Sequence, residues 1–116
     1  MEPLQALTEQ LRSFARERDW EQFHSPKNLA MALIAEAAEL LEHFQWVTEK
    51  DSFALGPAKL QEVKLELADV FLYLIRLSDQ LNIDLFAAAR EKLELNKTKY
   101  PADKVRGDSR KYSEYE

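Results

Sequence analysis

The chain has 116 residues, a length that suits one domain with a single hydrophobic core. Leucine (18), alanine (14) and glutamate (14) dominate it, whereas glycine occurs twice and cysteine is absent. These counts exclude a disulfide framework, a zinc ribbon and a glycine-rich phosphate loop. The net charge of −5 argues against a nucleic-acid polymer as partner. Because helix-favouring residues are abundant and β-branched residues are scarce, the composition predicts an all-α protein.

The sequence carries no signal for a membrane or for secretion. Its longest unbroken apolar stretch, residues 29–35, has seven residues, far fewer than a bilayer span requires. The first ten residues, MEPLQALTEQ, lack the basic and apolar regions of a signal peptide. We therefore expect a cytoplasmic protein that does not bind a membrane.

The first two predicted helices cover residues 3–18 and 26–47. In the first, apolar positions recur every three or four residues and form one stripe: Leu4, Leu7, Leu11 and Phe14. Residues 19–25 break this period and form a connection rich in aromatic side chains. Ser25 followed by Pro26 then marks the start of the second helix, as a cap residue and a first-turn proline do. The inner face of that helix is predicted to be Leu29, Leu33, Ala37, Leu40, Phe44 and Val47.

Two more helices are predicted over residues 59–81 and from Asp84 to about Tyr100. The loop at 48–58 contains Gly56-Pro57, a turn signal. The centre of the third helix, VFLYLI at 70–75, is apolar on all sides, which indicates a central helix or an oligomer interface. The polar residues 101–116 are expected to be irregular. The layout predicts a four-helix bundle subunit in one domain, with a helical core over about residues 3–100.

Two acidic motifs are the most informative feature of the chain. The second helix carries Glu36-Ala-Ala-Glu39 and the third carries Glu66-Leu-Ala-Asp69, and acids three residues apart share one helix face. Their neighbours are apolar, and burying such charges costs several kcal/mol unless positive charge lies among them. An all-oxygen ligand set suits Mg²⁺ or Mn²⁺. The alternative is that each pair is a solvated helix edge, balanced by nearby cations such as Lys27, Lys64 or Arg76.

Aromatic side chains offer a second indication. Trp20 and Phe23 lie in the first connection, Trp46 lies at the end of the second helix, and Tyr73 lies one helical turn beyond Asp69. Indole rings are suitable surfaces for stacking a nucleobase. The alternative is that Trp20 and Trp46 close the ends of the bundle as core residues.

Together these motifs resemble those of a known family. The order E-x-x-E, 26 residues, E-x-x-D is similar to that of the all-α nucleoside triphosphate pyrophosphohydrolases, the MazG-like superfamily. The segment RDWEQFHSPKNLAMALIAEAAELLEHFQW at 18–46 resembles the dCTP pyrophosphatase branch in particular. Further similarity lies in ELADVFLYL at 66–74 and in the tail pattern NKTKYP…RG…KY at 96–112.

The resemblance implies Mg²⁺-dependent hydrolysis of a nucleoside triphosphate, dCTP or a C5-modified dCTP, to the monophosphate and pyrophosphate. It implies a homotetramer built as a dimer of dimers, or a dimer. The implied metal ligands are Glu36, Glu39, Glu66 and Asp69, of which Glu36 and Glu39 are also the expected catalytic residues. The implied nucleotide contacts are Trp20, Glu21, Gln22, Phe23, His24, Trp46, Tyr73, Asn96, Lys99, Arg106 and Lys111.

The chain departs from this family at Leu11, where vertebrate-type enzymes have a base-contacting histidine. A leucine cannot form a hydrogen bond with a base edge, so a strict preference for cytosine does not follow from the resemblance. A different class of function also stays open at this point. A non-catalytic helical module for oligomerisation or protein interaction could use the carboxylates to bind basic groups and VFLYLI as its docking face.

Overall fold

The structure, a computed structural model, describes residues 2–109. The chain divides into two compact units, Met1–Ile83 and Asp84–Glu116, and each is described by itself. Every regular element within the described residues is helical, which confirms the all-α prediction. No helix in this range has the length and apolar character needed to cross a bilayer.

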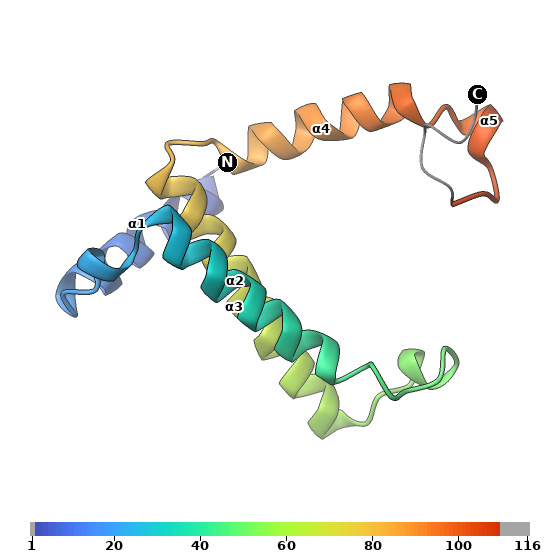
Figure 1. Cartoon of the computed structure of the whole chain (residues 1–116), viewed down its shortest axis with the longest axis horizontal. Helices are drawn as coiled ribbons and strands as arrows, with labels where there is room; N and C mark the ends of the chain where they lie inside the picture. Colours follow the sequence, from blue (N-terminus) through green and yellow to red (C-terminus); the bar gives the residue numbers. More distant parts are fainter. Residues whose placement is uncertain (1, 110–116) are drawn as a thin grey trace. The chain divides into compact units, whose positions relative to one another are not determined.

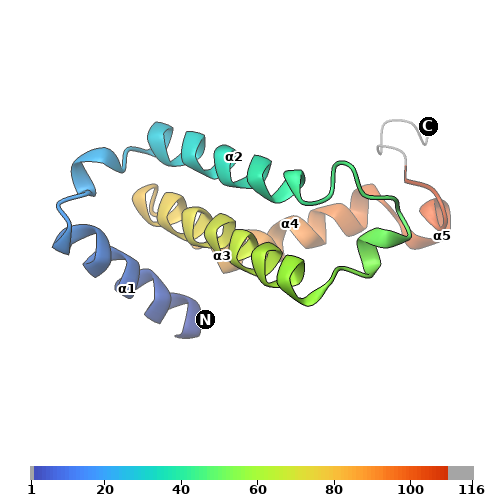
Figure 2. The same ribbon diagram turned by 90° about the horizontal axis from the view of Figure 1, so that it is seen from below.

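The first unit contains three long helices, with α3 at its centre. These are α1 (Glu2–Glu17), α2 (Pro26–Glu42) and α3 (Pro57–Gln80), and two short 3₁₀ turns, η1 (Glu21–Phe23) and η2 (Asp51–Phe53), lie in the connections. Helices α2 and α3 run antiparallel and side by side, and α1 packs against α3 (Figures 1 and 2). The apolar centre predicted for the third helix therefore belongs to a helix with two neighbours.

The start of α2 is fixed by the residues that predicted it. The Ser25 hydroxyl accepts a hydrogen bond from the Asn28 backbone N–H at 3.1 Å, and Pro26 occupies the first turn. The Asn28 side chain in turn donates to the Phe23 carbonyl at 3.0 Å. The cap thus ties the first turn of α2 to the connection before it.

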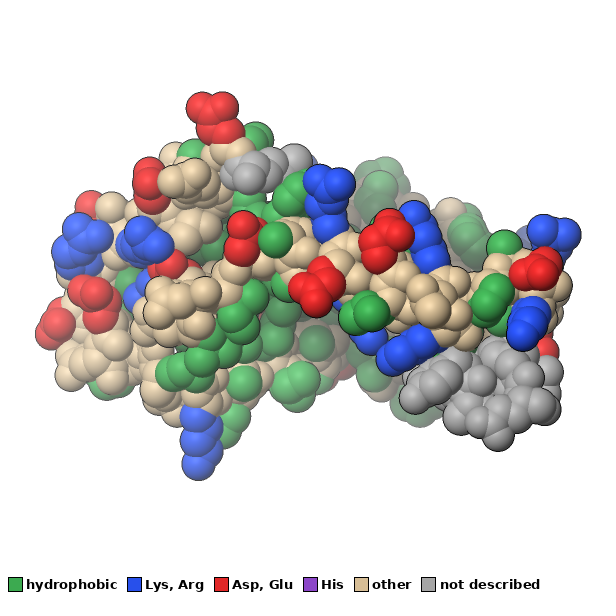
Figure 3. All heavy atoms as spheres, turned by 90° about the horizontal axis from the view of Figure 1, so that it is seen from above, with side chains coloured by type: hydrophobic (Ala, Val, Ile, Leu, Met, Phe, Trp, Pro, Cys, Tyr) green, Lys and Arg blue, Asp and Glu red, His purple; other side chains and the backbone are tan. Residues whose placement is uncertain are grey.

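The core of this unit is small, and much apolar surface stays exposed. Leu29 of α2 is 1% exposed and Ile75 of α3 is 3% exposed. Phe71, in the middle of the apolar segment 70–75, is nevertheless 46% exposed. Large apolar side chains are exposed along both helices of the hairpin: Met31, Ile34, Leu41, Leu60, Leu65 and Leu67. Figure 3 shows hydrophobic side chains that reach the surface on the face drawn.

Two predicted helix boundaries are wrong. Helix α2 ends at Glu42 rather than at Val47, because the chain tightens into turns: the N–H of Phe44 bonds to the carbonyl of Leu41 at 2.8 Å, and that of Val47 bonds to Phe44 at 3.0 Å. Phe44 and Val47 therefore do not belong to the helix face predicted for them. Helix α3 begins two residues earlier than predicted, at Pro57, since the proline occupies its first turn.

The second unit contains α4 (Leu85–Lys99) and a short helix α5 (Ala102–Val105). Asp84 caps α4 as predicted, because its carboxylate accepts a hydrogen bond from the Ala87 N–H at 3.0 Å. The four predicted long helices are thus all present. The prediction of an irregular segment after Tyr100 is wrong at α5, where the chain forms one helical turn after Pro101.

Candidate functional site

Three carboxylates from α2 and α3 come together in the hairpin. Glu36, Glu39 and Glu66 each offer one oxygen, and these oxygens lie within 4.8 Å of one another. Glu36 and Glu66 are half-buried, whereas Glu39 is exposed. One oxygen of Glu36 and one of Glu66 are buried without any hydrogen-bond partner. An unsatisfied buried oxygen is costly, so the cluster fits a group that brings positive charge or hydrogen-bond donors.

The fourth predicted ligand, Asp69, is not a member of this group of three. It is exposed, and it lines a neighbouring cavity formed by α1, α3 and the connection between α1 and α2. Its charge still acts on the cluster, because it contributes to the raised pKa of Glu36. Asp69 therefore lies where the cluster and the cavity adjoin: its charge acts on Glu36 and Glu66, and its side chain lines the cavity.

The electrostatics of the cluster follow from burial and crowding. Burial raises the pKa of Glu36 to about 7, and hydrogen bonding to Glu39 and the charges of Glu39 and Asp69 act in the same direction. Burial, followed by the charge of Glu39, also raises the pKa of Glu66. Within residues 2–109 none of the four acids forms an ion pair with a lysine or arginine. The described residues thus give no support to a helix edge balanced by cations.

The composition of the cluster matches a hard divalent cation. All ligand atoms are carboxylate oxygens, the type of ligand that Mg²⁺ and Mn²⁺ prefer. A cation would offset the mutual repulsion of the acids and give a partner to the bare oxygens of Glu36 and Glu66. The residues present therefore fit the metal that the sequence motifs predict.

A cavity of about 230 Å³ lies in the same unit. Its lining is largely apolar and aromatic, with a few polar groups, as is typical of small-molecule sites. The lining residues are Leu11, Phe14, Trp20, His24, Asp69, Leu72, Tyr73 and Arg76. The structure thus brings together three of the predicted nucleotide contacts, Trp20, His24 and Tyr73. Leu11, the position at which the chain departs from the family pattern, lies in the same wall.

One residue of this cavity was missed as a site residue by the sequence analysis. The Arg76 side chain is only 7% exposed, and its Nε donates a hydrogen bond to His24 Nδ1 at 3.1 Å. Its Nη1 donates to Asp79 at 3.3 Å. From the sequence, Arg76 is predicted only as a possible counter-ion for the acidic motifs. No local signal could have found its partner, because His24 lies 52 positions earlier in the chain.

The other predicted contacts of the first unit do not line this cavity. Glu21, Gln22 and Phe23 form η1 and are exposed, and Gln22 bonds to Asp19. Trp46 is 89% exposed in the turn after α2, so it is not a core residue within this chain. Asn96 and Lys99 on α4 and Arg106 after α5 belong to the second unit, and Lys111 lies outside the described residues.

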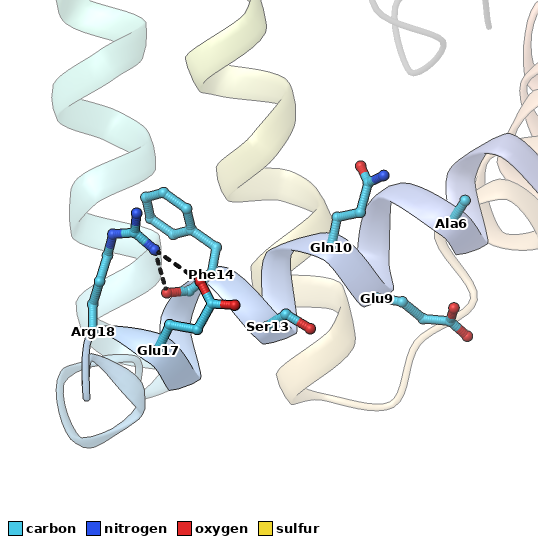
Figure 4. Close-up of a pocket in the computed structure, with 7 residues that line it drawn as sticks. All are labelled: Ala6, Glu9, Gln10, Ser13, Phe14, Glu17 and Arg18. Atoms are coloured by element: carbon cyan, nitrogen blue, oxygen red, sulfur yellow. Dashed lines mark hydrogen bonds and ion pairs between the residues drawn. The ribbon is translucent and has the colours of Figure 1, made fainter.

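A second hollow is open and lies along the outer face of α1 (Figure 4). Its lining residues come from α1 and the turn that follows it: Ala6, Glu9, Gln10, Ser13, Phe14, Glu17 and Arg18. Arg18 folds back over the Phe14 ring, 3.7 Å from its centroid, and donates to the Phe14 carbonyl at 3.1 Å. The hollow contains no group of carboxylates with unsatisfied oxygens, and it contains none of the predicted site residues.

Comparisons with known proteins point to one family. Residues 31–115 match the MazG-like family. The chain is 45% identical over 103 residues to dCTP pyrophosphatase 1 of Homo sapiens and 43% identical to that of Mus musculus, covering 87% of this chain. It spans 61% of the length of these relatives. The crystal structure of a pyrophosphatase from Archaeoglobus fulgidus superposes with a TM-score of 0.79 at 41% identity, covering 84% of this chain and 91% of that one.

Proposed function

The chain belongs to the MazG-like family, and on this premise we propose that it hydrolyses a nucleoside triphosphate to the monophosphate and pyrophosphate. The name of the relatives, dCTP pyrophosphatase 1, favours dCTP as substrate. A C5-modified dCTP is the second substrate in this proposal. The observation that carries the proposal is the carboxylate cluster with its two buried, partnerless oxygens. Asp69 links this cluster electrostatically to a cavity lined by aromatic side chains.

The residues that would hold the metal, Mg²⁺ with Mn²⁺ as the alternative, are Glu36, Glu39, Glu66 and Asp69. When bound, such an ion neutralises charge on phosphate oxygens and makes a bound water more acidic. The protein's own contribution is to gather the carboxylates on two adjacent helices.

The chemical step requires a base for the attacking water. In this proposal Glu36 accepts a proton from the water as its oxygen attacks the α-phosphorus, the bond from that phosphorus to the bridging oxygen breaks, and pyrophosphate leaves. Glu36 suits this role by position, because it is half-buried in the cluster and one of its oxygens has no hydrogen-bond partner. Glu39, which lies in the same cluster, is the second candidate for this role.

The nucleoside part would occupy the cavity, between aromatic walls supplied by Trp20 and Tyr73 and beside His24. Glu21, Gln22, Phe23 and Trp46 would complete the enclosure. The polar and basic residues proposed to contact the phosphates are Asn96, Lys99, Arg106 and Lys111. Residues 90–112 carry eight basic and four acidic side chains, which supports a phosphate-facing role for that stretch.

We also propose that residues 1–116 act as one functional domain and that the active form is a homodimer or homotetramer. The family match runs through both units of the chain, which supports a single functional domain. The exposed apolar side chains of α2 and α3, such as Phe71 and Leu67, support self-association because isolated chains rarely expose so many. A cytoplasmic location is part of the same proposal.

The experiment is turnover of dCTP and other nucleoside triphosphates by the purified protein, with Mg²⁺ or with EDTA. We expect metal-dependent release of monophosphate and pyrophosphate. Glu39→Gln and Asp69→Asn should each lower kcat/KM by at least about 100-fold while the protein stays helical, because each removes a ligand charge. Glu42→Gln, an exposed acid at the end of the same helix, is the matched control and should retain activity.

Two results would contradict the proposal. Inorganic phosphate as the direct product would exclude cleavage at the α-phosphorus, and full activity of both variants would exclude the metal assignment. A folded protein that turns over none of the nucleotides would instead favour the non-catalytic interaction module.

A further inference from the structure

His24 is held in one chemical form by Arg76. The Nε of arginine is always a donor, so the hydrogen bond of 3.1 Å from Arg76 Nε requires His24 Nδ1 to be an acceptor. A neutral imidazole that accepts at Nδ1 carries its proton on Nε2. Within residues 2–109 the Nε2 of His24 has no hydrogen-bond partner, and His24 lines the cavity.

Arg76 is itself braced from its other side. Its Nη1 donates to Asp79 Oδ2 at 3.3 Å, and Asp79 also accepts two hydrogen bonds from Arg12 of α1, at 2.7 Å from Nε and 2.5 Å from Nη2. The Asp79 side chain is only 12% exposed. The order Arg12–Asp79–Arg76–His24 therefore forms a charged network in which each buried charge has a partner.

The backbone of His24 is fixed from the same helix. The side-chain amide of Gln80, at the end of α3, donates to the His24 carbonyl at 2.6 Å. Arg76 and Gln80 lie one helical turn apart, so one face of α3 holds both the ring and the main chain of this residue. The ring position is thus set by α3, although His24 lies in the connection that follows η1.

We propose that Arg76, braced by Asp79 and Arg12, is a positioning residue that holds His24 as an Nε2–H donor, so that the cavity selects a nucleobase presenting a hydrogen-bond acceptor to it. The inference rests on the proposed function, in which the nucleoside part occupies the cavity. Leu11, which lines the same cavity, cannot form a hydrogen bond with the base. Arg76 would therefore control selectivity for the base through the hydrogen bond that His24 offers.

The charges around His24 agree with a neutral ring. Burial lowers the pKa of His24, and the positive charge of Arg76 lowers it further. Glu21 of η1 is the opposing group and acts to raise it. Asp79 and Arg12 complete the charged groups of the network, and they lie beyond Arg76 rather than against the ring.

The direct test is ¹⁵N NMR of the His24 ring in the full chain at pH 7. We expect the Nε2–H tautomer. Arg76→Met keeps the aliphatic stem and leaves Asp79 paired with Arg12. It should let the Nδ1–H tautomer appear beside Nε2–H, and it should raise the pKa of His24 part of the way to its ordinary value, since burial still lowers it. Arg16→Met, at an exposed arginine of α1 outside the network, is the control and should change neither the tautomer nor the pKa.

Two results would overturn the proposal: a proton on Nδ1 in the unmodified protein, or an unchanged tautomer population in a folded Arg76→Met protein. If Arg76→Met does not fold, the spectrum of the unmodified protein still decides the tautomer.

The kinetic test uses steady-state turnover of dCTP. Loss of a positioning contact to the base should raise KM about tenfold and leave kcat within about twofold, since the contact is made equally before and during the reaction. A fall in kcat with unchanged KM would overturn the positioning role. If the unmodified protein releases no pyrophosphate from any nucleotide, the proposed function fails, whereas the NMR result still decides whether Arg76 sets the form of His24.

Discussion

At the scale of single residues, the environment of Glu36 opposes the ionisation of its carboxyl group. Glu36 is half-buried on α2, one of its oxygens has no partner, and Glu39 and Asp69 add negative charge nearby. These conditions disfavour the ionised carboxylate, so the cluster should be a source of instability whenever no cation is bound.

The raised pKa of Glu36 predicts how the metal-free protein responds to pH. The unfolded carboxyl titrates near 4.5 and the folded one near 7, so the unfolded state releases its proton first as the pH rises. The contribution of Glu36 to the free energy of unfolding should therefore be most favourable below about pH 4.5. It should fall progressively as the pH rises to about 7. Urea unfolding in EDTA across this range measures the effect.

Glu36→Gln provides the comparison for this titration. Because the amide cannot ionise, the variant should gain stability relative to the unmodified protein as the pH rises from 4.5 to 7. The free energy of unfolding of Glu42→Gln should instead change with pH in the same way as that of the unmodified protein. A constant difference between Glu36→Gln and the unmodified protein at every pH would show that the environment of Glu36 is not the cause.

The sequence predicted the members of the cluster better than their arrangement. Spacing placed Glu36 and Glu39 on one face of α2, because residues three apart share a helix face, and the packing of α3 against α2 brings Glu66 to them. Spacing could not show that Asp69 also lines a cavity, since that depends on how α1 and α3 pack. The pair of Arg76 and His24 depends on contact across 52 positions, which no local pattern encodes.

At the scale of elements, local chemistry sets where helices begin more clearly than where they end. Ser25-Pro26 predicted the first residue of α2, and Gly56-Pro57 marks the start of α3 in a related way. The end of α2 carries no glycine or proline, and the apolar period continues through residue 47 after the helical hydrogen bonds have given way to tighter turns. The spacing of apolar residues indicates which face of a segment is buried, so it cannot by itself show where the helix ends.

The Ser25 cap is a testable element of this fold. Ser25→Ala removes the acceptor for the Asn28 N–H and should lower the free energy of unfolding by about 1 kcal/mol, whereas Ser25→Asp should retain most of it. Urea denaturation followed by circular dichroism measures both. Ser13→Ala, at an exposed serine inside α1 that caps no helix, is the control; an equal loss there would mean that the cap is not the source.

At the scale of the whole molecule, metal binding and folding should be coupled. A ligand that binds only the folded chain stabilises it by about 2.7 kcal/mol at a concentration 100 times its Kd. Mg²⁺ should therefore raise the melting temperature of the metal-free protein in a concentration-dependent way, and Glu39→Gln should abolish most of this shift. Choline chloride at the same ionic strength, free of divalent cations, is the control for a general effect of salt on the melting temperature. An equal shift in Glu39→Gln would place the bound ion elsewhere.

The bare oxygens of Glu36 and Glu66 also bear on how this chain tolerates mutation. Replacing a buried, unsatisfied acid by an apolar residue of similar volume is often neutral or stabilising. Selection for folding alone would then let Glu36 and Glu66 change to leucine or methionine. At these two positions, the residue that best stabilises the fold differs from the residue that activity requires. If a related protein no longer hydrolysed its substrate, we would expect these two positions to be among the first to be substituted.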